Sequence, residues 1–546
     1  MTIELLTNIT GPQGVIGPQG LPGTNAVPAD TAVAGYVSTA GTSETKTALL
    51  DRFGTEVAIR SVAEYGAVPS AVADQATAIN AAITAVPAGT ILRIPAGDYK
   101  VDSTITIGKA ITLIGPGRLV CSTDAAALRA TVDDVTITGG LKAIGRQRTA
   151  WVTGARGITA TGTLGTPIKR LTIGDVDLST FGGGAVVLEF CNDVKMTDTK
   201  ISACTYFGIA LLSVQRATIL RATVTDINLG GLVNAYGITA TRYNGTLAVY
   251  PRSTDVTITE ATITDVTDWA GIDTHAGNRI SAIRCIITGC KRGIDFVGSV
   301  DITDTIFAPI DALIQDCIVD GTGITTTHGI GLSGAENAGV ISEYATGRII
   351  GNHVVRCGDD TNNALGAFWF RTTRGMRHIG NRATEPGSHG VVFAQNNQSF
   401  HVSNFECTDP WSNTHTLASV VATRSVACTG IVTSFYGRRG TKTATTVLAW
   451  GLYQSDSSVD TTIILGADCH VEAGTLVVES GGGLRTFGDM RVSNVNIGRA
   501  AGKIGLYQAT PVTKAAAISS PTADVAALKT AVDLLRTAVK NIGITS

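Results

Sequence analysis

Short segments in which apolar and polar residues alternate fill most of the chain after its first ninety residues. The segments ILRIP, STITI and AITLIG, between residues 91 and 115, show this alternation, and Thr/Ile/Val-rich segments of the same kind follow them. Alternation sends every second side chain to one face, which is the pattern of a strand with one buried face. The chain is therefore predicted to be all-β.

A Gly-Ile dipeptide, or a close variant, recurs among these segments. It occurs at residues 157, 208, 237, 271, 293 and 329, and Gly390-Val391 continues the series. The interval of 22 residues between 271 and 293 is close to one coil of a parallel β-helix, and longer intervals require two coils or a loop insertion. One coil cannot bury its own apolar face, so neighbouring coils must stack. We therefore predict a right-handed parallel β-helix over residues 61–400, with a further β-rich region or terminal coils over 401–510.

A β-sandwich or a β-propeller is the competing architecture. A propeller would show a four-strand blade period with a Trp-Asp signature, and a sandwich would show many tight two-residue hairpins. Neither pattern is evident in the sequence, which favours the parallel β-helix.

One helix is expected at the start of the body. Residues 74–85 carry apolar side chains at helical spacing, and Pro87 follows them. The first coil of a stack needs its open apolar end covered, so we predict that this helix caps the solenoid.

The two ends of the chain both indicate a trimer. Gly11 to Asn25 has glycine at every third residue over five triplets, which is typical of a collagen-like triple helix, although a flexible linker remains the alternative. Residues 1–25 are thus an attachment peptide with a collagen-like stalk, and 26–60 a connector. In residues 511–546, apolar residues follow a heptad pattern that predicts a coiled coil, or else a single packed helix. Its apolar positions are Val525, Leu528, Val532, Leu535, Val539 and Ile542.

Composition excludes several classes of function. The net charge is -2 and there is no basic block, so a nucleic-acid partner is not expected. No apolar run is long enough to insert into a membrane, and the N-terminus lacks the features of a secretion signal. The ten cysteines are scattered singly, which favours buried free thiols over a disulfide framework. No metal or phosphate motif is legible, so neither a metal nor a cofactor is predicted.

The opening of the body resembles the N-terminal segment of the pectate-lyase superfamily. The resemblance rests on Tyr65-Gly66-Ala67, Asp74, Gly89 and the segment from Pro95 to Tyr99, PAGDY. The Gly-Asp-Gly usual after the alanine is replaced by VPSAVAD. The resemblance covers about forty residues and implies the fold. It does not imply an activity, because the family contains lyases, hydrolases and inactive scaffolds.

The layout as a whole resembles a bacteriophage tail spike or tail fibre. Such proteins join a short attachment peptide, a collagen-like stalk, a β-helix and a C-terminal trimerisation element. The resemblance implies a homotrimer in the virion, attached to other tail proteins through its N-terminus. It also implies a role outside the host cell, with a surface polysaccharide of the host as the ligand.

The segment from Trp269 to Gly277 carries the strongest candidate chemistry. Two Gly-Ile-Asp triplets lie 22 residues apart, so one coil would stack Asp273 on Asp295 at about 5 Å, the spacing of neighbouring strands. With the isoleucines inward, both carboxylates and His275 point outward, as a pair of glycosidase carboxylates would. Trp269 would offer a stacking surface to a sugar. The alternatives are solvated turn residues, or an Asp ladder hydrogen-bonded to His275.

Several other side chains are weaker candidates for binding a glycan. His328 precedes a Gly-Ile dipeptide, Glu343 lies in an expected loop, and Trp369 and Phe370 belong to an aromatic cluster that alternatively fills the core or contacts another subunit. Asp359 and Asp360 are loop candidates of the same kind. Arg292 is a candidate base for a lyase.

Two classes of function remain open from the sequence. One is a structural and adhesive tail component that binds a surface glycan without chemistry. The other is a polysaccharide depolymerase, either a hydrolase or a lyase, with the same fold.

Overall fold

The computed structural model describes most of the body of the chain. The described residues are 59–146, 150–228, 234–242, 246–300, 306–324, 327–337, 340–358, 365–409, 417–424, 428–438, 447–454, 462–472, 475–479, 483–486 and 533–534. The predicted collagen-like triplets lie outside these residues, and so does the coiled coil apart from the helical Asp533 and Leu534. The body begins at Ile59.

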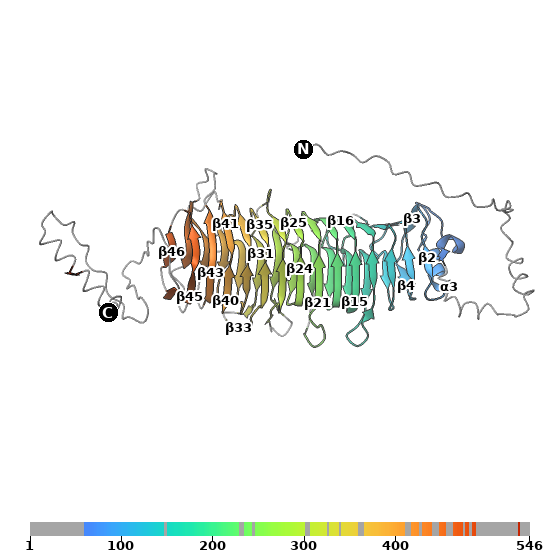
Figure 1. Cartoon of the computed structure of the whole chain (residues 1–546). Coiled ribbons are helices and arrows are strands. Elements are labelled where there is room, and N and C mark those ends of the chain that lie inside the picture. The colour runs from blue at the N-terminus through green and yellow to red at the C-terminus, as the bar shows by residue number, and fades with distance from the viewer. Residues whose placement is uncertain are drawn as a thin grey trace, which may run out of the picture. The chain divides into compact units, whose positions relative to one another are not determined.

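Three ladders of parallel strands build the body, and each coil contributes about one strand to each ladder (Figure 1). The first ladder contains β1 (Ile59–Ser61), β2 (Ile91–Arg93), β5 (Thr112–Ile114), β8 (Thr136–Thr138), β11 (Ile168–Lys169), β12 (Thr172–Gly174), β15 (Cys191–Thr197), β18 (Gln215–Leu220), β21 (Thr254–Thr259), β24 (Asn278–Ile283), β29 (Ala312–Gln315), β34 (Gly347–Ile350), β37 (Arg377–Ile379), β40 (Phe400–Ser403), β43 (Thr429–Arg438), β45 (Thr462–Val471) and β47 (Gly483–Thr486). The second ladder contains β3 (Asp98–Val101), β6 (Arg118–Cys121), β9 (Leu141–Ile144), β13 (Val176–Ser179), β16 (Lys200–Cys204), β19 (Thr223–Ile227), β22 (Thr262–Thr264), β25 (Ile286–Thr288), β30 (Ile318–Asp320), β35 (His353–Val355), β38 (Arg382–Thr384) and β41 (Phe405–Thr408). The long strand β43 pairs with both β40 and β41, so the first two ladders merge there.

The third ladder is a separate sheet of 14 strands. It contains β4 (Ile105–Ile107), β7 (Leu128–Ala130), β10 (Arg156–Thr161), β14 (Gly184–Glu189), β17 (Phe207–Leu212), β20 (Tyr236–Thr241), β23 (Ala270–His275), β26 (Arg292–Val297), β31 (His328–Ser333), β36 (Gly366–Arg371), β39 (His389–Phe393), β42 (Leu417–Thr423), β44 (Val447–Gln454) and β46 (Thr475–Glu479). Every pairing within the three ladders is parallel, so the predicted parallel β-helix is confirmed and the β-sandwich and propeller are excluded.

The Gly-Ile repeat marks the third ladder, and packing explains its glycine. The isoleucines at 209, 238, 272, 294 and 330 pair in register on consecutive strands and are completely buried. The glycine before each isoleucine also faces the core. A Cβ on Gly271 would lie 2.7 Å from Ile287 of the second ladder, and one on Gly293 would lie 2.3 Å from Val319. Glycine is therefore required because the second ladder fills the space that a side chain would need.

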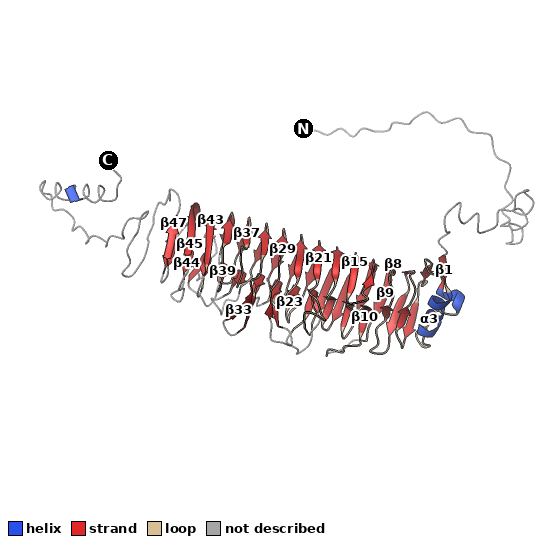
Figure 2. Cartoon of the chain, turned by 90° about the horizontal axis from the view of Figure 1, so that it is seen from below, coloured by secondary structure: helices blue, strands red, loops and turns tan. Residues whose placement is uncertain are grey.

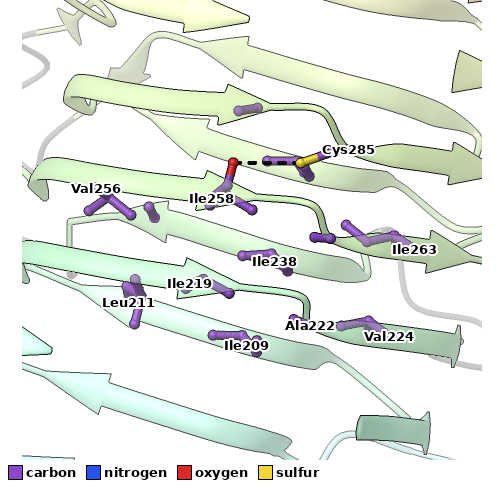
Figure 3. Packing of buried hydrophobic residues seen from close by; sticks show 14 of the residues in the cluster. Ile209, Leu211, Ile219, Ala222, Val224, Ile238, Val256, Ile258, Ile263 and Cys285 are labelled. Carbon is purple, nitrogen blue, oxygen red and sulfur yellow. Dashed lines mark hydrogen bonds between the residues drawn. The ribbon is translucent and has the colours of Figure 1, made fainter. Parts of the chain in front are cut away.

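Alternation supplies the rest of the core. Figure 3 shows core side chains of the three ladders packed together, among them Ile209 and Ile238 of the third ladder and Ile219 and Ile258 of the first. All ten cysteines are free and buried, as predicted. In Figure 3 the thiol of Cys285 reaches the backbone oxygen of Ile258, at 3.6 Å.

The predicted helix is α3 (Ala76–Ala85), and it lies at the first coil of the stack (Figure 2). Asp74 accepts a hydrogen bond from the backbone of Ala76 at 3.1 Å and from that of Asp102 at 2.9 Å, which ties the start of the helix to the first coil. Its buried residues, Ala76, Ile79, Ala82 and Ile83, cover the open apolar end. The 3-10 helix η1 (Val62–Tyr65) precedes it and ends at Gly66, whose φ of 86° favours glycine. Within the described part of the chain, no helix is long and apolar enough to cross a membrane.

Two antiparallel hairpins extend from the ends of strands in the third ladder. The hairpin β27 (Ser299–Val300)/β28 (Ile306–Phe307) follows β26, and the hairpin β32 (Ala335–Asn337)/β33 (Val340–Glu343) follows β31. The two hairpins contact each other through β28. The long intervals in the Gly-Ile repeat therefore include single coils enlarged by loop insertions.

Candidate functional site

Asp273 and Asp295 lie side by side on the outer face of the third ladder. They pair in register on β23 and β26, while Ile272 and Ile294 beside them face the core. The predicted stacking of these two residues is confirmed. Both carboxylates are nevertheless completely buried, because side chains on the outer face cover them. The alternative interpretation, solvated turn residues, is wrong because both residues lie within strands and are shielded from solvent.

Asp295 is held by two basic side chains. Arg292 Nη1 lies 2.5 Å from Oδ2, and His328 Nε2 lies 3.0 Å from Oδ1. Arg292 reaches a carboxylate three residues away because Gly293 and Ile294, between them, both face the core. Burial alone would raise the pKa of Asp295, but the charges and hydrogen bonds of His328 and Arg292 outweigh it and hold the pKa below its ordinary value. Asp295 is therefore ionised at neutral pH.

Asp273 has a different environment. Thr239 donates a hydrogen bond to Oδ2 at 3.1 Å, and His275 Nε2 lies 3.2 Å from the same oxygen. The other oxygen, Oδ1, has no hydrogen-bond partner among the described residues. Burial raises the pKa of Asp273 above its ordinary value, and His275 opposes this shift only in part. The side chain of His275 is 31% exposed, so it connects the buried carboxylates with the surface.

Trp269 and Trp369 both lie against cationic or imidazole groups of the site. The guanidinium carbon of Arg292 lies 3.7 Å from the ring centroid of Trp269, so one face of this indole is already covered. Trp369 stacks on His328, with centroids 5.5 Å apart and an interplanar angle of 20°. The structure thus brings both predicted tryptophans close to the carboxylate pair. Trp269 contacts Arg292 and Trp369 contacts His328, and these two basic side chains both contact Asp295.

Two predicted glycan-binding residues lie elsewhere. Phe370 is completely buried and packs on Phe393, with ring centroids 5.5 Å apart. Phe370 therefore fills the core and cannot contact a glycan. Glu343 accepts hydrogen bonds from Arg252 Nη2 at 2.6 Å and from the backbone of Ala308 at 2.7 Å. Its carboxylate joins the two hairpins, so its role in the structure is to hold the inserted loops together. Asp359 and Asp360 lie outside the described residues.

Sequence reasoning identified Arg292 and His328 on this face but missed Tyr236. Tyr236 on β20 pairs in register with Ala270, which precedes Arg292 and His328 in the same column of the third ladder. Each of these residues stands directly before a Gly-Ile dipeptide, so its position relative to the repeat was the available signal. In the described part of the chain, His, Cys, Asp and Glu side chains do not gather in threes as a metal site would require.

The arrangement combines binding groups with groups suited to acid-base chemistry. One carboxyl is biased toward its protonated form and its neighbour toward its ionised form. Pairs of carboxyls separated in this way serve as proton donor and as base or nucleophile in glycoside hydrolysis. Arg292 is less suited to the role of a lyase base, because its guanidinium is already engaged by the buried Asp295 carboxylate at 2.5 Å.

Comparisons with known proteins agree with the fold. Residues 59–295 match the family model described as rhamnogalacturonase A/epimerase, pectate lyase-like. No curated protein sequence matches the chain. A similar solved structure is the family 28 exopolygalacturonase of Yersinia enterocolitica, at 13% identity over 69% of this chain and 78% of that chain, with a TM-score of 0.50.

Viral proteins are also among the similar structures. ORF18 of Geobacillus virus E2 has 15% identity over 72% of this chain, which spans 60% of the length of ORF18, and the TM-score is 0.35. Tailspike protein 3 of bacteriophage CBA120 has 12% identity over 85% of this chain and 67% of its own, with a TM-score of 0.35. The resemblance carried by residues 65–99 agrees with the family match over residues 59–295. The described body of the chain is a parallel β-helix.

Proposed function

We propose that this chain is a tail spike or tail fibre of a bacteriophage, and that it binds a host surface glycan on the outer face of the third ladder around Asp273 and Asp295. The layout of the chain supports the tail role, with collagen-like triplets before the β-helix and apolar heptads after it. This layout makes a homotrimer, attached through its N-terminus to another tail protein, the simplest assembly.

A group of buried polar atoms without partners carries the proposal for the binding site. Asp273 Oδ1, His328 Nδ1, Trp269 Nε1 and Arg292 Nε are buried, and none has a hydrogen-bond partner among the described residues. Leaving such groups unpaired costs about 1–3 kcal/mol each, so they gain from a ligand rich in donors and acceptors. Sugar hydroxyls both donate and accept, and the indoles nearby suit the apolar faces of sugar rings.

A depolymerase is the second candidate, and the opposite pKa shifts of the two carboxyls favour it. Asp273 would act as the proton donor, and the ionised Asp295 as the nucleophile or base. Neighbouring parallel strands lie about 4.8 Å apart, which is close to the carboxyl separation of retaining glycosidases, about 5–5.5 Å. Hydrolysis in this form leaves a new reducing end and no unsaturated sugar.

The test is the size distribution of a candidate host polysaccharide before and after incubation with purified protein, together with the absorbance of unsaturated sugar. Binding without shortening identifies an adhesin, shortening without absorbance a hydrolase, and shortening with absorbance a lyase. Asp273→Asn and Asp295→Asn should abolish cleavage if the chain is a hydrolase, and weaken binding if it is an adhesin. Asp177→Asn is the control, because Asp177 lies on β13 of the second ladder and its side chain is 44% exposed. Unchanged behaviour of both site variants contradicts the proposed site.

A further inference from the structure

A continuous chain of aromatic rings leads from the surface to the carboxylate pair. Trp151 is 46% exposed, and its ring centroid lies 5.1 Å from that of Tyr206. Tyr206 in turn lies 5.7 Å from Tyr236, which lies 6.1 Å from His275. Aromatic residues make up only 5% of the chain, so such a series on the outer face needs an explanation beyond core packing.

The backbone that follows the outermost ring of this series is hydrogen-bonded to the next coil. The backbone of Val152, next to Trp151, donates a hydrogen bond to Gly182 at 2.9 Å, and Gly183 donates one to Ala155 at 2.7 Å. These bonds fasten residues 152–155 to the turn before β14. The indole contacts the ring of Tyr206, which lies two coils further on, directly before β17.

The two tyrosines connect this indole to the reactive end of the site. Phe207 supports them from β17, because its ring stacks on that of Tyr236 with centroids 5.7 Å apart and an interplanar angle of 23°. His275, whose ring centroid lies 6.1 Å from that of Tyr236, has its Nε2 atom 3.2 Å from Asp273 Oδ2, so the series of rings ends at this carboxyl. The rings thus span the coils between the exposed indole and Asp273.

We propose that Trp151 and Tyr206, with the buried Tyr236 behind them, form a carbohydrate-stacking surface that extends the site along the stack and binds the polysaccharide chain beyond the sugar at Asp273. This inference rests on the proposed function. Flat aromatic faces suit the apolar faces of sugar rings, and the tyrosine hydroxyls provide hydrogen bonds to the same ligand. A polymer is the fitting ligand, because a single sugar at the carboxylates would not reach an exposed ring three links along the series.

Binding as a function of chain length tests the inference. The probe is a bacterial surface polysaccharide that the full-length protein binds, separated by gel filtration into short and long chains. Trp151→Ala should weaken binding of the long chains roughly three- to tenfold, as expected for the loss of one aromatic stacking contact. Binding of the shortest chains should not change, and Trp151→Phe should restore most of the affinity. Leu164→Ala is the matched control, because Leu164 is 53% exposed and makes none of these ring contacts.

The outcomes separate this inference from the proposed function. If Trp151→Ala leaves long-chain binding unchanged while Asp273→Asn weakens it, the stacking surface is refuted and the carboxylate site stands. An equal loss for short and long chains, or a change in sedimentation, would show that Trp151 supports the fold or a subunit contact instead. If the wild-type chain binds none of a broad set of surface polysaccharides, both the inference and the proposed function are overturned.

Discussion

The imidazole of His328 and the carboxylate of Asp295 meet across two neighbouring strands, β31 and β26, with Nε2 3.0 Å from Oδ1. Gly331 makes room for this contact. A Cβ at that position would lie 2.5 Å from His328 Nε2 and 2.6 Å from Asp295 Oδ1. The two side chains are almost completely buried, so neither has space to move aside. The position of His328 on Asp295 therefore depends on the absence of a side chain at residue 331.

Gly331→Ala should separate this pair and leave the Asp295 carboxylate with Arg292 alone. We expect a loss of about 1–3 kcal/mol in the free energy of unfolding, which is the cost of an unpaired buried polar group. Glycan binding should weaken as well. Urea denaturation and a binding assay measure the two effects. Gly165→Ala is the control, because its added methyl group meets nothing within 4 Å. Equal stability of the two variants would contradict the role given to Gly331.

The repeat and the neighbouring carboxylates were predictable because both depend on spacing along the sequence. A Gly-Ile-Asp triplet one coil from another must stack on it in a parallel β-helix, and Asp273 and Asp295 do so. Strict alternation also separates Trp369, which faces outward, from Phe370, which faces the core. The alternation along that strand therefore indicates a core position for Phe370. The prediction of glycan binding relied on the aromatic cluster instead.

The partners of the carboxylates were not predictable in the same way. Arg292 contacts Asp295 only because two consecutive residues face the core, and strict alternation gives the opposite expectation. Glu343 lies in a hairpin whose packing depends on a second hairpin and on Arg252, which is 91 residues away. Contacts between inserted loops follow no period, so no pattern in the sequence identifies them.

Asn352 and Asn381 form a buried hydrogen-bonded pair where the chain passes from the first ladder of strands to the second. We expect this asparagine pair to be essential for stability. Asn381 accepts hydrogen bonds from the backbone and the side chain of Asn352, at 2.8 and 2.9 Å, and donates one to Ile349 at 2.7 Å. Asn381→Ala should cost about 2–4 kcal/mol, because it leaves several buried groups unpaired. Asn192→Ala is the control, since Asn192 lies on the outer side of β15 and its side chain is only partly buried. A similar midpoint of urea denaturation for both variants would refute the predicted contribution of the asparagine pair to stability.

The buried cysteines should be chemically inert in the folded protein. Burial raises the pKa of Cys121, Cys191 and Cys407 to about 12, so the reactive thiolate is scarce at neutral pH. We expect a thiol reagent such as Ellman's reagent to react with few or none of the ten cysteines in native protein, and with all ten in guanidinium. A reducing agent should not change the melting temperature. Rapid labelling without denaturant would show that these thiols are accessible.

The trimer is a separate prediction that rests on the two ends of the chain. Sedimentation equilibrium at low concentration should give about three times the chain mass of 56.3 kDa. Replacing the heptad residues Leu528 and Leu535 by Asp should shift the mass toward the monomer, because the charges would lie in the apolar seam. Lys529 lies outside the predicted seam, so Lys529→Asp is the control. A monomeric wild-type chain would contradict the interpretation of both ends.

His378 makes stability depend on pH. It occupies a core position of the first ladder, between Ile349 and Val402 in register, and the rings of Phe368 and Phe405 lie 4.8 Å from its own. Neither ring nitrogen has a hydrogen-bond partner among the described residues. Burial lowers the pKa of His378 from 6.5 to about 3, because the apolar environment disfavours a charged imidazole and the residue's own backbone offsets this only in part.

The sign of the effect follows from proton binding. Between about pH 6.5 and pH 3 the unfolded chain binds a proton at residue 378 and the folded chain does not, so stability falls as the pH falls through this range, by about 1.4 kcal/mol per unit. His378→Leu removes this dependence and places an apolar side chain in an apolar column. At pH 7 the free energy of unfolding of the variant, measured in urea, should equal or exceed that of the wild type. The difference in favour of the variant should grow as the pH is lowered toward 4. Carboxylates elsewhere titrate equally in both proteins and cancel in that difference, so a constant difference across the range would show that His378 does not titrate on unfolding.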